Sequence, residues 1–127
     1  MTERRSLNTY QLPNMYKIYG IKNCDTMKKA FDWLTANNVL YEFHDYKKTV
    51  ISEEKIQEWL TQKPLEVLIN RAGTTWKKLS DEEKSMDEKG AIKLMMEKPS
   101  MIKRPIIEND KIVIMGFNSD IYEQIFK

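Results

Sequence analysis

The sequence is poor in the residues that build disulfides and metal sites, with a single cysteine, Cys24, and a single histidine, His44. One cysteine cannot close a disulfide within the chain, and one cysteine with one histidine cannot form a zinc site of ordinary composition. We therefore expect no metal site and no internal disulfide. This cysteine usage is typical of a reducing compartment, so we expect a cytoplasmic protein.

The sequence also lacks long apolar runs and an excess of one charge. No stretch approaches the roughly 18 apolar residues of a membrane-spanning helix. The net charge is +2, and basic and acidic residues alternate in segments such as KKTVISEEKIQEW. A nucleic-acid-binding protein usually carries a concentrated basic face. We therefore expect no membrane span and no direct contact with nucleic acid, and we expect a monomer.

The length of 127 residues corresponds to about one domain. The first segment, MTERRSLNTYQLPN, is basic but has no apolar core, so it does not resemble a secretory signal. Pro13 and Asn14 form a breaker pair, and Met15 opens the first patterned segment. We predict a flexible extension over residues 1–14 and a single domain over residues 15–127.

Hydrophobic periodicity predicts the element order β-α-β, then a helical insertion, then β-β-α. The first unit is a strand over Met15–Tyr19, a helix from Thr26 to Asn37-Asn38 with Asp25 or Cys24 at its N-cap, and a strand over Val39–Phe43. The insertion is a helix from Ser52 to about Gln62, a short helix from Pro64, and one or two helices between Ser80 and Lys98, broken at Gly90. The last unit is a hairpin of Ile106-Ile107 and Lys111–Met115, then a helix over Asp120–Phe126 capped by Ser119. This order predicts an α/β protein with a thioredoxin-like fold and a mixed four-stranded sheet.

Cys24 lies in the stretch YGIKNCDTMKKAFDWL, where a predicted strand ends and a predicted helix begins. Unpaired backbone N–H groups and the positive end of the helix dipole favour an anion at such a position. A thiolate is an anion and is the reactive form of cysteine, so this position lowers the thiol pKa. Lys22, Lys28 and Lys29 favour the thiolate too, whereas Asp25 opposes it. The alternative is that Cys24 is a small buried apolar residue, and its position alone leaves both interpretations open.

Two arginines are candidates for binding an anion near the thiol. Arg71, in INRAGTTW, follows a predicted short helix, and Arg104 directly precedes Pro105 and the third predicted strand. Guanidinium groups suit carboxylates and oxyanions, although arginines at such places are commonly solvated or paired with surface acids. Thioredoxin-like folds commonly place a cis-proline before this strand, facing the thiol, so we predict a cis bond before Pro105. His44 is more typical of a structural residue on an edge strand.

Four segments in order, YGIKNCDTMKKAFDWL, YEFHDYKK, LINRAGTTWKKL and IKRPIIENDKIVIMGF, resemble the arsenate reductase (ArsC)-related family. The resemblance covers Met15 to Lys127 and is greatest to the YffB-like branch of a family that also contains Spx-like regulators. It implies a thioredoxin-like fold with a helical insertion and a catalytic cysteine at Cys24. Arg71 and Arg104 match two arginines that hold the oxyanion in glutathione- and glutaredoxin-coupled arsenate reductases.

The chain departs from the family pattern at four places, one of which is the loop after the cysteine, where Asp25-Thr26 stand in place of small residues. The reductases carry a histidine where this chain has Gly20, and a third arginine in the region that reads IVIMGF here, Ile112–Phe117. Many Spx-like regulators use a Cys-x-x-Cys switch, and the second cysteine is replaced by Met27. Fewer cations predict weaker binding of a tetrahedral oxyanion, and the absence of a second cysteine excludes an intramolecular switch.

The resemblance therefore implies a glutathione-dependent monothiol reductase in which Cys24 forms a mixed disulfide that an external thiol resolves. Glutathione would be a co-substrate and no cofactor would be tightly bound, with glutaredoxin as a possible partner. Lys22, Thr26, Arg71 and Arg104 would bind substrate or glutathione, and Pro105 would be structural. The alternatives are an Spx-like adaptor that binds the RNA polymerase α subunit, and an arsenate reductase.

Overall fold

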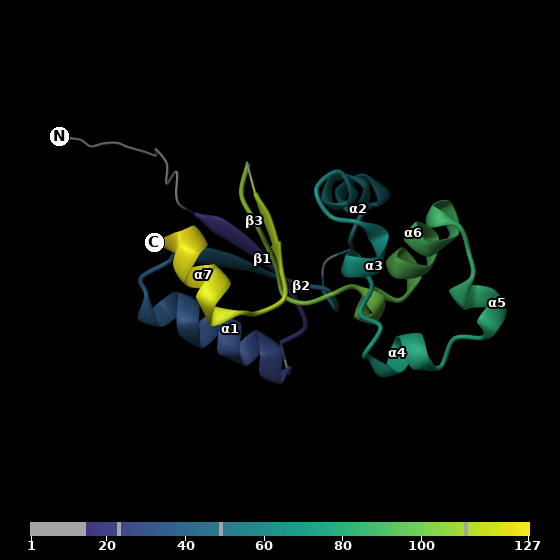
Figure 1. The fold of residues 1–127 in the computed structure, drawn as a ribbon, viewed down its shortest axis with the longest axis horizontal. Helices are drawn as coiled ribbons and strands as arrows, with labels where there is room; N and C mark the ends of the chain where they lie inside the picture. Colours follow the sequence, from purple (N-terminus) through teal and green to yellow (C-terminus); the bar gives the residue numbers. More distant parts are fainter. Residues whose placement is uncertain (1–14, 23, 49, 111) are drawn as a thin grey trace.

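The computed structural model describes residues 15–22, 24–48, 50–110 and 112–127, so the extension predicted over residues 1–14 lies outside the described residues. The element order matches the prediction, with a β-α-β unit, a set of inserted helices, and a β-β-α unit (Figure 1). None of the helices in the described part is long and apolar enough to cross a membrane.

The sheet has four strands in the order β2-β1-β3-β4, formed by β1 (Tyr16–Gly20), β2 (Tyr41–Asp45), β3 (Ile106–Glu108) and β4 (Val113–Met115). β1 pairs in parallel with β2 and antiparallel with β3, and β3 pairs antiparallel with β4. The sheet is therefore mixed, as the sequence predicts, and β2 is one of its edge strands. A parallel pair joined by one helix places the start of that helix at the C-terminal end of β1.

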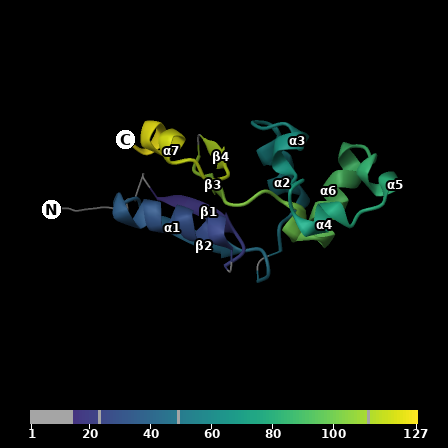
Figure 2. The same ribbon diagram turned by 60° about the horizontal axis from the view of Figure 1, so that its bottom comes forward.

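The two faces of the sheet bury different cores because successive strand residues point to opposite sides. On one face, α1 (Asp25–Ala36) and α7 (Ser119–Phe126) pack on the sheet through a cluster of buried side chains. We call it the α1/α7 core: Ile18, Met27, Ala30, Leu34, Ile107, Ile114 and Tyr122. Figure 2 shows α1 alongside β1 and β2. Met27, Ala30 and Leu34 recur at the spacing of one helix face, so this core follows directly from the sequence.

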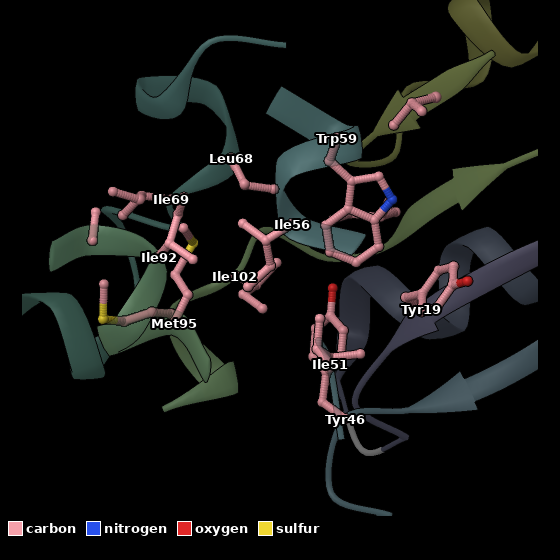
Figure 3. Packing of buried hydrophobic residues seen from close by; sticks show 14 of the residues in the cluster. Tyr19, Tyr46, Ile51, Ile56, Trp59, Leu68, Ile69, Ile92, Met95 and Ile102 are labelled. Carbon is pink, nitrogen blue, oxygen red and sulfur yellow. The ribbon is translucent and has the colours of Figure 1, made fainter. Parts of the chain in front are cut away.

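The opposite face of the sheet packs against the inserted helices. These are α2 (Glu53–Leu60), α3 (Leu65–Leu68), α4 (Thr74–Lys77), α5 (Asp81–Lys84), α6 (Glu88–Glu97) and the 3-10 turn η1 (Pro99–Met101). Tyr19, Ile106 and Val113 from the strands join Trp59 of α2 in one cluster, which we call the insert core and which continues among α3, α6 and η1. Figure 3 shows Trp59 between Tyr19 and the aliphatic residues of the insertion.

Several element boundaries differ from the sequence prediction for local reasons. β2 begins at Tyr41 and not at Val39, because the Val39 N–H donates to the Leu34 carbonyl at 2.9 Å and so closes the preceding helix. The predicted helix break at Gly90 is wrong: the Asp87 side chain accepts from the Gly90 N–H at 2.8 Å, so Gly90 lies in the first turn of α6.

One further prediction about a helix terminus is corrected. Asn118, not Ser119, caps α7, since its side chain accepts from the Ile121 N–H at 3.1 Å. After Arg71, the residues Thr74–Lys77 form the short helix α4, which the sequence pattern does not predict. Neither the start of α7 nor the four residues of α4 have an apolar periodicity that would predict them from the sequence.

Candidate active site around Cys24

Cys24 is the N-cap residue of α1, in an extended backbone conformation with φ −147° and ψ 131°. Its carbonyl accepts the first helical hydrogen bond, from the Lys28 N–H at 3.0 Å. The side chain is partly exposed and the thiol is free. The sulfur makes no hydrogen bond of regular capping geometry. The thiol therefore stands at the helix start, open on one side to solvent and a reaction partner.

The environment of Cys24 lowers the pKa of its thiol. Partial burial of the sulfur acts in the opposite direction, but the backbone N–H of Met27, the Arg104 guanidinium and the backbone N–H of Thr26 together outweigh it. Arg104 acts both as a hydrogen-bond donor and as a positive charge. Donors aimed at the anionic form stabilise the thiolate, which is the nucleophile. These donors therefore favour the thiolate form of Cys24.

Arg104 reaches the thiol from the segment that leads into β3. The Arg104–Pro105 bond is cis, as predicted, and Pro105 is buried. One end of the guanidinium donates from Nη1 to the Ser100 carbonyl at 3.1 Å, which fixes the side chain. The Nε atom is buried and has no partner in the described part of the chain. A buried N–H without an acceptor is costly, so this arginine retains a donor for a ligand.

The site lacks space for a side chain at position 20. A Cβ atom added to Gly20 would collide with the thioether of Met27, with Cε at 2.7 Å, and would stand 3.4 Å from Cβ of Arg104. Met27 is fully buried. The glycine and the methionine are thus complementary: Met27 fills the volume that a larger side chain at position 20 would need. Gly20 and Met27 therefore form a single packing arrangement.

Arg71 is placed less directly than Arg104. Its guanidinium lies over the Trp76 ring, 5.3 Å from the ring centroid, and the side chain is exposed. The residue before it is joined to η1, because the Asn70 N–H donates to the Met101 carbonyl at 2.7 Å, and Thr75 Oγ1 of α4 lies 2.6 Å from Ser100 Oγ. Ser100 is also the residue that holds Arg104. The structure therefore connects the Arg71 loop to the site, while the Arg71 side chain itself stacks on Trp76.

The remaining predicted residues lie at the same end of the sheet or at its edge. Lys22 is exposed in the β1–α1 loop, and Thr26 contributes its backbone N–H to the sulfur. His44 lies on the edge strand β2, where its Nε2 is 2.8 Å from a carboxylate oxygen of Glu42 and its ring stacks on Tyr19. This agrees with a structural role for His44. No group of three or more His, Cys, Asp or Glu residues suited to a metal occurs among the residues described.

The sequence analysis missed a buried carboxylate. Glu108 on β3 is only 7% exposed and accepts hydrogen bonds from Tyr19 Oη at 2.8 Å, Trp59 Nε1 at 2.8 Å and Lys55 Nζ at 2.9 Å. Burial favours its protonated form, but these three donors lower its pKa overall. The network joins β1 and β3 to α2 and so fixes the insertion against the sheet. The one indication of this carboxylate in the sequence is that Glu108 directly follows the apolar pair Ile106-Ile107.

Comparison with known proteins gives a consistent result. The model of the ArsC family matches residues 19–125. An uncharacterized protein of Haemophilus influenzae is 40% identical over 113 residues, covering 88% of this chain and 99% of its own length. The global transcriptional regulator Spx of Streptococcus agalactiae is 27% identical over 108 residues, covering 84% of this chain and 79% of its own length.

Solved structures agree with the sequence relatives. A YFFB protein superposes with a TM-score of 0.84 at 45% identity, covering 88% of this chain and 99% of that one. An arsenate reductase (ArsC) related protein from Brucella melitensis superposes with a TM-score of 0.72 at 47% identity, covering 89% of this chain and 95% of that one. Both cover nearly nine tenths of this chain, so the fold prediction is confirmed.

Proposed function

The chain belongs to the ArsC family, and on that premise we propose that it is a glutathione-dependent monothiol reductase with Cys24 as its nucleophile. The observation that carries this proposal is the environment of the thiol: it stands at a helix N-cap, where the Arg104 guanidinium and the backbone N–H groups of Met27 and Thr26 lower its pKa. Such an environment favours the thiolate, which is the reactive form of cysteine. The relatives support a thiol-based function at the level of the family, and the glutathione dependence is our inference.

The proposed cycle uses one protein thiol and two molecules of glutathione. The Cys24 thiolate attacks the glutathione sulfur of a mixed disulfide, forming a Cys24–glutathione disulfide and releasing the substrate as a thiolate. A second glutathione thiolate then attacks the bound glutathione sulfur, giving glutathione disulfide and regenerating the Cys24 thiolate. Electrons pass from glutathione to the substrate disulfide. The lone cysteine of the chain makes this external resolution necessary.

Arg104 has the clearest role in this scheme, since it stabilises the thiolate and keeps a buried Nε donor unpaired in the described structure. A carboxylate of glutathione is a suitable acceptor for that donor. Thr26 contributes its N–H to the developing thiolate, Lys22 supplies a positive charge at the loop, and Pro105 shapes the segment that presents Arg104. Arg71 is assigned to the same anion, which requires its guanidinium to leave the Trp76 ring.

The first experiment is the pH dependence of alkylation of Cys24 by iodoacetamide. We expect a midpoint below that of an unperturbed thiol, because the donors around the sulfur favour the thiolate, and we expect Arg104→Gln to move the midpoint upward. Arg71→Gln is the matched control, since Arg71 stacks on Trp76. A midpoint equal to that of free cysteine would refute the activated thiolate. Glutathione-coupled reduction of a mixed disulfide, absent in Cys24→Ser, then tests the catalytic cycle.

Arsenate reduction is a less favoured activity for this site. The packing of Met27 against Gly20 fills the place of the reductase histidine, and the IVIMGF segment supplies no third arginine. We expect little or no arsenate-dependent oxidation of glutathione. Rapid turnover with arsenate would show that Cys24 and Arg104 suffice for oxyanion chemistry.

A transcriptional adaptor is the second candidate function, because relatives at 27% identity are global transcriptional regulators. In that case the chain would bind the α subunit of RNA polymerase, and Cys24 would act as a sensor modified by glutathione. A binding measurement with purified α subunit separates the two. Binding that persists in Cys24→Ser favours the adaptor, whereas turnover lost in Cys24→Ser without such binding favours the reductase.

A further inference from the structure

A groove lies on the outer side of α1 and the edge strand β2. It is lined by Lys22, Phe31, Tyr41, Phe43, Asp45 and Lys48. Its aromatic residues form one connected wall, since the Phe31 ring stacks on Tyr41 at 5.4 Å and meets the edge of Phe43 at 5.2 Å between centroids. All three rings are half-buried. The wall therefore offers apolar faces to a ligand without losing its own packing.

The mouth of this groove carries positive charge. Lys22 and Lys48 are both exposed there. Asp45 is the acidic residue of the lining, and its Oδ1 accepts from the Lys47 backbone N–H at 2.9 Å. One carboxylate oxygen is thus engaged by the turn that follows β2. Two ammonium groups against one partly engaged carboxylate favour an anionic ligand.

The groove reaches the β1–α1 loop, which carries Lys22 of its lining and leads to Cys24. Gly20, the last residue of β1, pairs with Asp45, the last residue of β2, so both strand ends lie at the edge of the sheet where α1 begins. Lys22 is two residues before Cys24 in the loop that leaves this edge. The order β2-β1-β3 places the groove on one side of β1 and the segment carrying Arg104 on the other. The loop that leads to Cys24 therefore lies between the segment carrying Arg104 and the groove.

We propose that this groove is the subsite for the substrate group that leaves when Cys24 attacks the mixed disulfide, and that it selects anionic thiol compounds bearing an aromatic or other flat apolar group. The negative group would lie between Lys22 and Lys48, and the flat group against Phe31, Tyr41 and Phe43. This inference rests on the proposed function, since it assigns the substrate class of the same thiol. It adds Lys48 and the aromatic wall as determinants of specificity.

The test compares two aromatic disulfides that differ in charge, 5,5′-dithiobis(2-nitrobenzoate) and 4,4′-dithiodipyridine. In each case the Cys24 thiolate attacks one sulfur, one aromatic half remains on Cys24, and the other leaves as a thiolate or thione measured by absorbance. We expect Lys48→Gln to slow the reaction with the anionic reagent about three- to tenfold and to leave the neutral reagent within about twofold. The difference should shrink at high salt, because the exposed charges are screened.

Lys47→Gln is the matched control, because Lys47 is exposed and adjacent in sequence but does not line the groove. We expect it to change neither rate by more than about twofold. Tyr41→Leu tests the wall and should slow both aromatic reagents relative to the small neutral reagent 2-hydroxyethyl disulfide. Equal effects of Lys48→Gln and Lys47→Gln, or a Lys48→Gln rate that falls equally for both aromatic reagents, would overturn the subsite.

The outcome is separable from that of the proposed function. Release of the aromatic thiol needs one attack by Cys24 and no glutathione, so selectivity is measurable even if turnover with glutathione fails. Turnover with glutathione and no charge selectivity would sustain the reductase and remove the subsite. Selectivity without turnover would sustain the subsite and remove the glutathione cycle.

Discussion

The two faces of the sheet are stabilised in different ways. The α1/α7 core is formed by apolar side chains, and its largest member, Tyr122, directs its hydroxyl to the Gly116 carbonyl at 2.7 Å. The insert core contains a buried carboxylate, Glu108, that three donors from β1 and α2 surround. The two faces carry alternate residues of the same strands, so the sheet divides an apolar core from one that depends on a charge.

This difference affects how each half tolerates change. An apolar core loses stability in proportion to the cavity that remains, because neighbouring side chains repack only partly around the removed volume. A buried charge is tolerated only while its partners remain. Removing one member leaves the other buried polar groups without a hydrogen-bond or charge partner. The helices that shape the Arg104 segment are attached through the second kind of core. We therefore expect the insertion, and with it the site, to be the more sensitive half.

The largest effect is expected for Glu108→Ala, which leaves Lys55, the Trp59 indole and the Tyr19 hydroxyl without their shared acceptor. We expect the free energy of unfolding in urea to fall by about 3 to 5 kcal/mol. Glu123→Ala is the control, since its ion pair with Lys127 is half exposed at 3.4 Å and contributes less than about 1 kcal/mol. Equal losses for the two variants would remove the distinction between the faces.

The pH dependence of stability follows from the same carboxylate. The pKa of Glu108 is lowered in the folded state, so its contribution is present above the pKa of an unfolded glutamate and is lost as the pH falls through the folded value. We expect the free energy of unfolding of the wild type to decrease below about pH 4.5. Glu108→Gln should have a shallower decrease in this range. An unchanged slope would assign the acid sensitivity to other carboxylates.

On the apolar face, Leu34→Ala is the comparable test. Leu34 is fully buried between α1 and the sheet. We expect a loss of about 3 kcal/mol from the removed methyl groups and the residual cavity. The loss should not change as the pH falls below about 4.5, in contrast to that of Glu108→Ala. A pH-dependent loss would show that the two cores are electrostatically coupled.

The boundary between the two halves is tested at Gly20. Gly20→Ala places a Cβ against the thioether of Met27, and we expect a loss of about 1 to 2 kcal/mol. Combined with Met27→Ala, the double variant should lose less than the sum of the two single variants. Chemical denaturation of the four proteins gives this coupling energy. Simple additivity would mean that the glycine has a purely backbone role.

The smallest effects are expected at the helix caps, one in each half. Ser80 and Glu83 form a capping box at the start of α5, and Asn118 caps α7. Ser80→Ala and Asn118→Ala should each cost about 1 kcal/mol, because each removes an acceptor from an exposed backbone N–H. Thermal unfolding measures both. A much larger cost at Ser80 would indicate that the insertion unfolds as a separate unit.

Much of the fold was predictable because its determinants are local. The spacing of Met27, Ala30 and Leu34 defined α1, and the breaker and capping residues around it defined its ends within two residues. Short helices were the least predictable, as α4 and the start of α6 show. Four residues carry too little periodicity, and the capping role of Asp87 depends on backbone geometry that is not visible in the sequence.

The sequence by itself determined the order of the elements and the position of Cys24 at a helix N-terminus, because both depend on residues adjacent along the chain. Only the tertiary structure decided which arginine acts on the thiol. Arg104 is brought to Cys24 across the sheet, whereas Arg71 stacks on Trp76. The tertiary structure also decided that Met27 fills the space next to Gly20, and that Glu108 accepts hydrogen bonds from Tyr19 and Trp59. Those partners are far apart in the chain, and their contacts form only when the strands and the insertion pack together.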